Sequence, residues 1–259
     1  MKDTIKTHIA ALMGKGLRED NRKFDDYRKI SVDVNPIPRA NGSCRVKMGE
    51  TEVLVGVKLE VGTPFPDTPD SGVMIVNAEL IPLANSKFEP GPPRAPAVEI
   101  ARVVDRGIRE SKCIDFPKLC ITPKEKVWLV FIDVYPINDA GNLFDAAALG
   151  AIIALKNAVM PKYDAKEEKV LYKELTKNKL PVSKTPVLCT FAKINGSIVL
   201  DPSTREEKAL DSRISISTLE NGNICAMQKG ERGTFTDKEI MDSVDKAIKK
   251  GKELRKLIK

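Results

Sequence analysis

Apolar and polar side chains alternate along several short stretches of this chain, and turn-forming residues separate one stretch from the next. In the clearest example, Val53, Val55 and Val57 alternate with other residues shortly after the pair Gly49-Glu50. Such alternation predicts a half-buried β-strand, and a short glycine-containing turn between two such runs predicts a hairpin. The expected strands are Ile30–Val34, Cys44–Met48, Thr51–Leu59, Val73–Leu80, Val127–Tyr135, Val187–Ile194, Ser197–Leu200, Arg213–Leu219 and Ile224–Lys229.

Other stretches repeat their apolar residues at helical spacing. Residues 4–13 predict a first helix, which Gly14 ends. The segment Asp145–Met160 carries no charge after its first residue until Lys156, so we expect a helix buried between two layers of structure. A long amphipathic helix with lysines on its outer face is expected near the C-terminus, marked by Ile240, Val244, Ile248, Leu254 and Ile258.

The order of these elements predicts an α+β fold in a single domain spanning residues 1–259. Each half, about 25–160 and about 180–259, combines antiparallel or mixed strands with covering helices. Val127–Tyr135 is nearly continuous in apolar residues, which predicts a central strand that is buried on both faces and ended by Pro136. The proline and the many lysines from Pro161 through Lys179 predict a linker between the halves.

Composition places the chain among ordinary globular proteins and narrows its chemistry. Hydrophobic residues make up 42% and charged residues 31% of the chain, and no run is apolar enough to predict a membrane span. The net charge of +7 permits a polyanionic partner without requiring one. The five cysteines are scattered and form no C-x-x-C pair, which favours reduced thiols in a cytoplasmic protein over disulfides or a zinc site. His8, the one histidine, lies at helical spacing among apolar residues, so we expect a helix residue rather than a catalytic base or a metal ligand.

An arginine-bearing helix follows a segment rich in proline and glycine within the stretch Phe88–Ser111. At about 100° per residue, Arg102, Arg106 and Arg109 lie within roughly 60° of one another, opposite a strip of apolar residues. Guanidinium groups bind phosphate bidentately and stay charged, so these three residues, the arginine stripe, indicate an anionic ligand. The alternative is a solvated face on which Asp105 and Arg109 form an i,i+4 ion pair.

Four segments of the chain resemble the RNase PH family of phosphorolytic exoribonucleases. They are GSCRVKMGETEVLVGVK, EIARVVDRGIRES, VWLVFIDVYPINDAGN and SIVLDPSTREEKALDSRISI, and the resemblance runs over nearly the whole chain. Within the family, PDTPDSGVMIVNAELIPLA and FEPGPP are most similar to the non-catalytic ring subunit of the archaeal exosome. The resemblance implies an RNase PH-like fold of two packed βαβ-like halves with mixed sheets and helices. It also implies alternation with a catalytic RNase PH-like subunit in a six-membered ring around an RNA channel.

The first departure from the catalytic members of that family lies before the buried helix. Catalytic relatives hold phosphate there at a Gly-Ser/Thr-Arg turn, whereas this chain has Gly141-Asn142-Leu143, with Leu143 in the place of the arginine. A free helix N-terminus attracts phosphate through its unpaired N–H groups. We expect Asn142 and Asp145 to occupy those donors as a capping box, which predicts a structural turn.

Two further departures concern the acid and the RNA grip. The catalytic carboxylate of the relatives, thirteen positions along when Asp201 is counted as the first, corresponds to Arg213, and Asp211 is the nearest carboxylate that could take its place. The arginine pair that grips RNA in catalytic relatives corresponds to Ala95 and Pro96, with Arg94 one residue away. The resemblance therefore predicts no catalytic residue in this chain.

We expect a non-catalytic, RNA-binding scaffold subunit of a 3′→5′ phosphorolytic exoribonuclease ring, without a metal or cofactor of its own and with phosphate at the partner's site. Arg106 and Arg109, followed by Arg102 and Arg94, are the expected RNA contacts. The resemblance implies a heterodimer with a catalytic RNase PH-like subunit, three such dimers in a ring, RNA-binding cap proteins and single-stranded RNA. Two alternatives remain open: an active phosphate-dependent exoribonuclease or nucleotidyltransferase, and a free-standing RNA-binding or structural protein.

Overall fold

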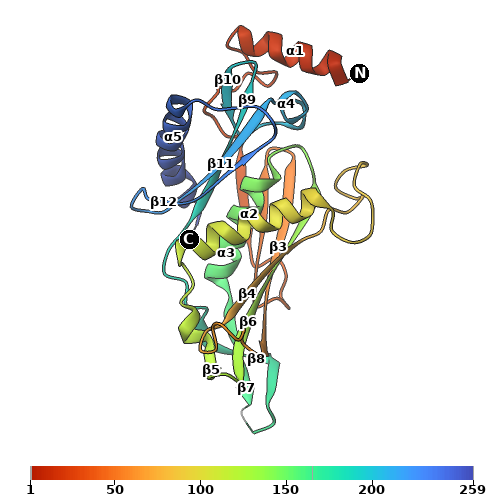
Figure 1. Cartoon of the computed structure of the whole chain (residues 1–259). Coiled ribbons are helices and arrows are strands. Elements are labelled where there is room, and N and C mark those ends of the chain that lie inside the picture. The colour runs from red at the N-terminus through yellow and green to blue at the C-terminus, as the bar shows by residue number, and fades with distance from the viewer. Residues whose placement is uncertain (1, 165, 259) are drawn as a thin grey trace.

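The computed structural model describes residues 2–164 and 166–258, and its larger sheet has six strands (Figure 1). These strands are β1 (Ile30–Val34), β2 (Gly42–Met48), β3 (Thr51–Gly62), β4 (Val73–Ala78), β5 (Cys120–Thr122) and β6 (Lys126–Asn138). They lie in the order β1-β2-β3-β6-β4, and β5 pairs with β6. The β4–β6 pair is parallel and the others are antiparallel. At the end of this order, β4 is an edge strand.

A second, four-stranded sheet forms from the C-terminal part of the chain. Its strands β9 (Val187–Ile194), β10 (Ser197–Leu200), β11 (Ser212–Thr218) and β12 (Ile224–Gly230) are antiparallel, in the order β10-β9-β11-β12. The helix α5 (Asp237–Arg255) begins at a capping box of Thr236 and Glu239. It packs Val244, Ala247 and Leu254 against this sheet (Figure 1).

The helix α3 (Leu143–Asn157) lies between the two sheets, as its uncharged sequence predicts. It packs against β2 and β3 on one side and against β9 on the other. Twelve of its residues are buried, which leaves no continuous face for solvent. The helix α2 (Ala95–Ser111) packs beside α3 and against β4 and β12. Its buried face holds Ile100, Val103, Val104 and Ile108, as predicted.

The remaining helices are short or lie at one end of the molecule. The helix α1 (Lys2–Gly14) packs on α4 (Thr204–Ala209), where Ile9 and Met13 enter a third apolar cluster. A short 3-10 helix, Phe116–Leu119, precedes β5. In the part of the chain that the structure describes, no helix has the length and apolar character needed to cross a membrane.

Two expectations about β6 are wrong. The strand is buried on one face alone, because Val130, Ile132 and Val134 are fully buried while the residues between them are half-buried. Pro136 does not end the strand but lies within it, paired with Val53 beside a shift in register. Such an irregularity tolerates proline, because the ladder hydrogen bond that proline cannot donate is already interrupted there.

The segment that was expected to be a linker is a two-stranded antiparallel ribbon, β7 (Val159–Asp164) and β8 (Lys169–Lys179), at the lower end of Figure 1. Charged residues on both strands conceal the alternation in the sequence. Lys162 and Glu174 form an ion pair across the ribbon at 2.9 Å, and the Tyr163 ring packs edge-on against Trp128. The other predicted strands are confirmed apart from a few boundary residues.

Candidate nucleic-acid interface

The helix α2 carries the arginine stripe on its outer face, as the residue spacing predicts. Arg102, Arg106 and Arg109 are exposed, while the apolar side of α2 faces the core. Pro96 lies in the first turn, and Lys112 adopts a left-handed conformation at the C-cap. Both are residues that define helix ends, so the three guanidinium groups project from a well-delimited helix.

Arg109 is held within its own helix by Asp105. Its Nε and Nη2 donate to the two carboxylate oxygens of Asp105 at 3.0 and 2.7 Å. Nη2 also donates to the backbone carbonyl of Met74 on the edge strand β4, at 3.2 Å. The hydrogen bonds to Asp105 raise the pKa of Arg109. The i,i+4 pair that was the alternative to RNA binding is therefore present, and a phosphate would have to compete with Asp105 for this guanidinium.

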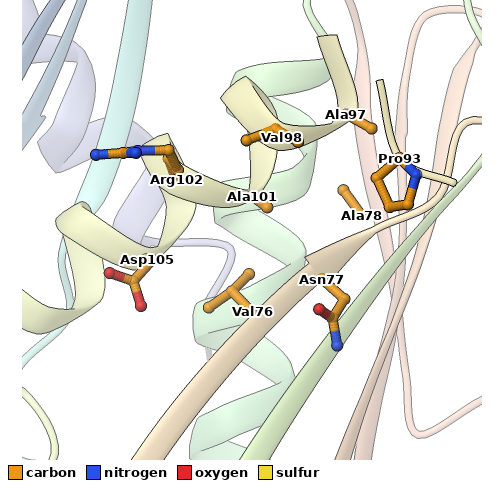
Figure 2. Close-up of a pocket in the computed structure, with 9 residues that line it drawn as sticks. All are labelled: Val76, Asn77, Ala78, Pro93, Ala97, Val98, Ala101, Arg102 and Asp105. Atoms are coloured by element: carbon orange, nitrogen blue, oxygen red, sulfur yellow. The ribbon is translucent and has the colours of Figure 1, made fainter. Parts of the chain in front are cut away.

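Arg102 and Arg106 are more available. The Nη1 of Arg106 lies 3.4 Å from Gln228 Oε1 on β12, a long hydrogen bond. Among residues 2–164 and 166–258, the Arg102 side chain has no hydrogen-bond or ion-pair partner. It lies at the edge of a groove of about 250 Å³ between α2 and β4, lined by Val76 and Ala97 among others. Figure 2 shows the Arg102 side chain directed away from the floor of this groove.

Arg94 lies apart from the stripe, at the N-cap of α2. Its side chain is 73% exposed and pairs with Glu89 at 2.5 Å. It precedes Arg102 by eight positions, which is about 12 Å along a helix axis. Ala95 and Pro96 follow it and are also exposed. The structure therefore brings Arg102, Arg106 and Arg109 together and leaves Arg94 as a separate loop position.

The turn before α3 uses its backbone donors within the protein. The N–H of Gly141 donates to Asp139 Oδ1 at 3.1 Å. The N–H of Asn142 donates to Glu207 Oε1 at 2.8 Å, and that of Asp145 donates to Asn142 Oδ1 at 3.4 Å. Gly141 has a φ of 96°, and a Cβ there would lie 2.5 Å from the backbone that precedes α4. A phosphate at this helix N-terminus would thus have to displace carboxylates from a closely packed turn.

Asn142 caps α3 as expected, but Asp145 does not complete a capping box. The Asp145 carboxylate instead accepts hydrogen bonds from the Tyr27 hydroxyl at 2.8 Å and from the N–H and Oγ1 of Thr190 at 3.0 and 2.7 Å. Glu207 accepts the backbone N–H that was assigned to Asp145. Sequence reasoning missed this because Glu207 comes from α4, a short helix that the apolar pattern does not reveal.

The carboxylates around the turn are in unlike environments. Burial raises the pKa of Asp145 to about 6 and that of Glu207 to about 7. Burial alone would also raise the pKa of Asp201, but its hydrogen bonds and ion pair with Arg28 hold that pKa below its ordinary value. Arg28 donates to both Asp201 oxygens at 2.9 and 2.7 Å, and Asn142 Nδ2 donates at 2.9 Å. Carboxylates and their donors thus fill the region where catalytic relatives hold phosphate.

Arg213 places a buried cation where the resemblance puts a catalytic acid. Its Nη2 donates to Glu99 Oε1 on α2 at 2.5 Å, and its guanidinium lies 4.1 Å from the ring centroid of Phe144 on α3. Asp211 is held in another direction, by Lys6 at 3.1 Å and by the backbone N–H that follows β9 at 2.8 Å. The structure therefore does not bring Asp211 into the place of the missing acid.

Sequence reasoning missed several members of this region, among them Glu207, Glu99 and Tyr27. The S-x-x-E signature of the capping box at Ser203 and Glu206 could have revealed α4, and with it Glu207. Glu99 could have been noticed as an acid beside a basic stripe. Nothing in the sequence near Tyr27 indicates that its hydroxyl reaches α3, because that contact spans 118 positions.

Among the described residues, no group of three or more His, Cys, Asp or Glu side chains is placed so that it could hold a metal ion. His8 lies on α1, 51% exposed, with its Nε2 3.2 Å from Glu19 Oε1. It is a surface helix residue and takes no part in the region around α2 and α3.

Comparisons with known proteins give a consistent result. Domain 1 of the 3′ exoribonuclease family (RNase_PH) matches residues 26–161, and domain 2 (RNase_PH_C) matches residues 184–250. The exosome complex component Rrp42 of Thermococcus kodakarensis is 48% identical over 100% of this chain and 95% of its own length. The protein of the same name from Pyrococcus abyssi is 50% identical over 98% of this chain and 93% of its own length.

Solved structures agree with these sequence matches. A structure described as the Archaeoglobus fulgidus exosome with RNA bound to the active site contains a chain with a TM-score of 0.92 and 42% identity, over 100% of this chain and 99% of that one. An archaeal exosome core contains a chain with a TM-score of 0.87 and 39% identity, over 100% of this chain and 98% of that one.

Proposed function

Because the chain belongs to the 3′ exoribonuclease family of RNase PH and has that family's fold, we propose that it is a non-catalytic, RNA-binding subunit of a phosphorolytic exoribonuclease ring. The relatives described above carry the name of an exosome component, and one related structure is of an exosome with RNA at its active site. In this proposal a catalytic RNase PH-like partner performs the chemistry. This chain shapes the interface and holds the RNA backbone.

The hydrogen bond from the Asn142 N–H to Glu207 is the observation that carries the non-catalytic part of the proposal. Phosphorolysis needs an inorganic phosphate next to the scissile bond, and this family's phosphate turn is occupied here by a carboxylate. Leu143 stands where an arginine would bind the phosphate, and Arg213 stands where the resemblance puts the acid. A carboxylate beside the turn also repels phosphate electrostatically.

The arginine stripe supports the RNA-binding part of the proposal. Arg102, Arg106 and Arg109 are exposed on one helix face, and guanidinium groups suit bidentate contacts to phosphate oxygens. Contacts to phosphate position a strand without reading its sequence, so binding by this face is independent of base identity. Neutralising phosphates releases counterions, so the binding weakens steeply as salt is added.

The assembly and location follow from the same proposal. The chain pairs with its catalytic partner as a heterodimer, three heterodimers alternate in a six-membered ring, and RNA-binding cap proteins sit on that ring. Phosphate binds at the partner's site, and this chain holds no cofactor. The five free thiols support a reducing compartment such as the cytoplasm.

A phosphorolysis assay on three samples tests the proposed function. Single-stranded RNA and inorganic phosphate are incubated with this chain alone, with a catalytic RNase PH-like partner alone, and with the two together. We expect no nucleoside diphosphate release from this chain alone and the highest release from the mixture. Release by this chain alone would establish the active-enzyme alternative. A mixture that neither assembles nor exceeds the partner alone would favour a free-standing RNA-binding protein.

A further inference from the structure

The Arg213 side chain joins four elements of the fold. It leaves β11 opposite Gly230 of β12, and a Cβ at Gly230 would lie 2.5 Å from Arg213 Nη2. The guanidinium therefore crosses β12 where only glycine leaves room for it. On its way it stacks over Phe144 in the first turn of α3, and it ends on Glu99 of α2 at 2.5 Å. A single buried cation thus ties the C-terminal sheet to both long helices of the N-terminal half.

Glu99 lies at the border of the arginine stripe. At about 100° per residue, Glu99 is roughly 20° from Arg106 and roughly 60° from Arg102 around α2. Because these residues belong to one rigid helix, holding Glu99 in place would also fix the directions in which Arg102 and Arg106 project. Arg106 itself reaches Gln228 on β12 through a long hydrogen bond of 3.4 Å, which fixes the helix only weakly. The Arg213–Glu99 pair is shorter and more buried than the Arg106–Gln228 hydrogen bond.

We propose that Arg213 is a positioning residue: through Glu99 it sets the rotation of α2, and so aims Arg102 and Arg106 at the RNA backbone. This inference rests on the proposed function, because it assumes that the stripe binds RNA. The position that holds a catalytic acid in active relatives serves here to orient the RNA-binding helix.

A simpler role for Arg213 would be to neutralise Glu99, whose free carboxylate would otherwise repel RNA beside Arg106. The double variant Glu99→Ala/Arg213→Met separates the two roles. It removes both charges, so no repulsion arises, and it removes the link between α2 and β11. Methionine fills much of the volume of the arginine's aliphatic stem, and replacing even a buried ion pair with apolar side chains commonly preserves folding.

The experiment measures kcat and KM for single-stranded RNA with the double variant assembled with its catalytic partner, alongside its folding stability. We expect KM to rise roughly three- to tenfold, as for other coupled side-chain pairs, with kcat, ring assembly and melting temperature unchanged. The single variant Arg213→Met should raise KM to a similar extent. Hydrogen exchange of α2 should be faster in both variants than in the wild-type complex.

A matched control pair lies away from α2. Lys193 and Glu239 form a half-buried ion pair at 2.7 Å between β9 and α5, and glutamine can replace Glu239 in the capping box. The double variant Lys193→Met/Glu239→Gln should leave KM at the wild-type value. A raised KM in this control would show that general loosening of the C-terminal half, rather than loss of the Arg213–Glu99 pair, weakens RNA binding.

A third variant makes failure of this inference distinguishable from failure of the proposed function. Arg102→Gln/Arg106→Gln removes the RNA contacts themselves and should raise KM. If it does so while Glu99→Ala/Arg213→Met has wild-type KM, the positioning role is wrong and the RNA-binding stripe stands. If Arg102→Gln/Arg106→Gln also has wild-type KM, both the stripe and the positioning role are wrong.

Discussion

Asp105 and Arg109 form a two-point ion pair on the outer face of α2, with nitrogen–oxygen distances of 2.7 and 3.0 Å. The carboxylate of Asp105 occupies the Nε and Nη2 edge of this guanidinium, one of the two edges that could hold a phosphate bidentately. It therefore competes with RNA for Arg109 from within the same helix. The two residues are four positions apart, so the competition is built into the local sequence.

The variant Asp105→Asn should bind RNA more tightly, because it releases the Arg109 guanidinium. An exposed i,i+4 pair contributes about 0.3–0.5 kcal/mol, so the gain in affinity of the assembled ring should be about twofold at low salt. The variant Glu110→Gln is the control, since it removes the same charge beside Arg109 without freeing its donors. Equal gains in both variants would show that only net charge matters, and no gain in Asp105→Asn would remove Arg109 from the RNA contacts. Affinity is measured by titrating a fluorescent single-stranded RNA.

Arg102 should contribute more to RNA binding than Arg109, because no carboxylate among the described residues competes for it. Arg102→Gln and Arg109→Gln in the assembled ring make the comparison with the same change in charge. Removing one contact to a phosphate should lower the slope of log affinity against log salt by about 0.7 for a single strand. We expect this change in slope for Arg102→Gln and a smaller one for Arg109→Gln. A larger effect of Arg109→Gln would mean that RNA displaces Asp105 completely.

The arginine stripe could be predicted from the sequence alone, whereas the contacts around the turn Gly141-Asn142-Leu143 could not. Periodicity correctly predicts that Arg102, Arg106 and Arg109 share one exposed face, because helix geometry is local. It could not predict that Asp145 turns to Tyr27 and Thr190 while Glu207 takes its place, because these partners meet only through tertiary packing. The ribbon of β7 and β8 was missed for another reason: β7 is largely half-buried, the described side chains of β8 are largely exposed, and both strands carry charged residues, so burial leaves little alternation in the sequence.

Placing an arginine at position 143, as in the catalytic relatives, should not create a phosphate-binding site. In Leu143→Arg, the N–H of Asn142 still donates to Glu207 and that of Gly141 still donates to Asp139, so a phosphate would have to displace both carboxylates. We expect no phosphate binding by calorimetry and no phosphorolysis by the variant alone. Leu143→Met controls for the change in packing, because Leu143 is buried. Phosphate-dependent RNA degradation by Leu143→Arg alone would show that the carboxylates around the turn yield to phosphate, contrary to the proposal.

Replacing either of two adjacent glutamates on α4 with glutamine should change the folding stability, but in opposite directions for the two positions. Arg18 donates to both carboxylate oxygens of Glu206, at 2.8 and 2.6 Å, inside the protein. Glu206→Gln leaves that buried arginine without its counterion, which should cost about 3–5 kcal/mol of folding free energy at pH 8. Glu207 has no such partner within the described part of the chain, and its oxygen accepts a backbone N–H that the neutral amide of Gln can accept equally well.

The pH dependence of Glu207→Gln gives the sharpest test of this contrast. Burial raises the pKa of Glu207 from 4.5 to about 7. Between these values the folded protein keeps a proton that the unfolded chain has released, so the stabilising contribution of Glu207 is complete below its unfolded pKa and is lost as the pH rises towards 7. Glu207→Gln removes this loss and should be more stable than the wild type by on the order of 1–3 kcal/mol at pH 8, and by much less at pH 5. Denaturant unfolding at the two pH values measures the difference in the free energy of unfolding. If Glu207→Gln is no more stable than the wild type at pH 8, then the charged form of Glu207 does not destabilise the fold beside Asn142.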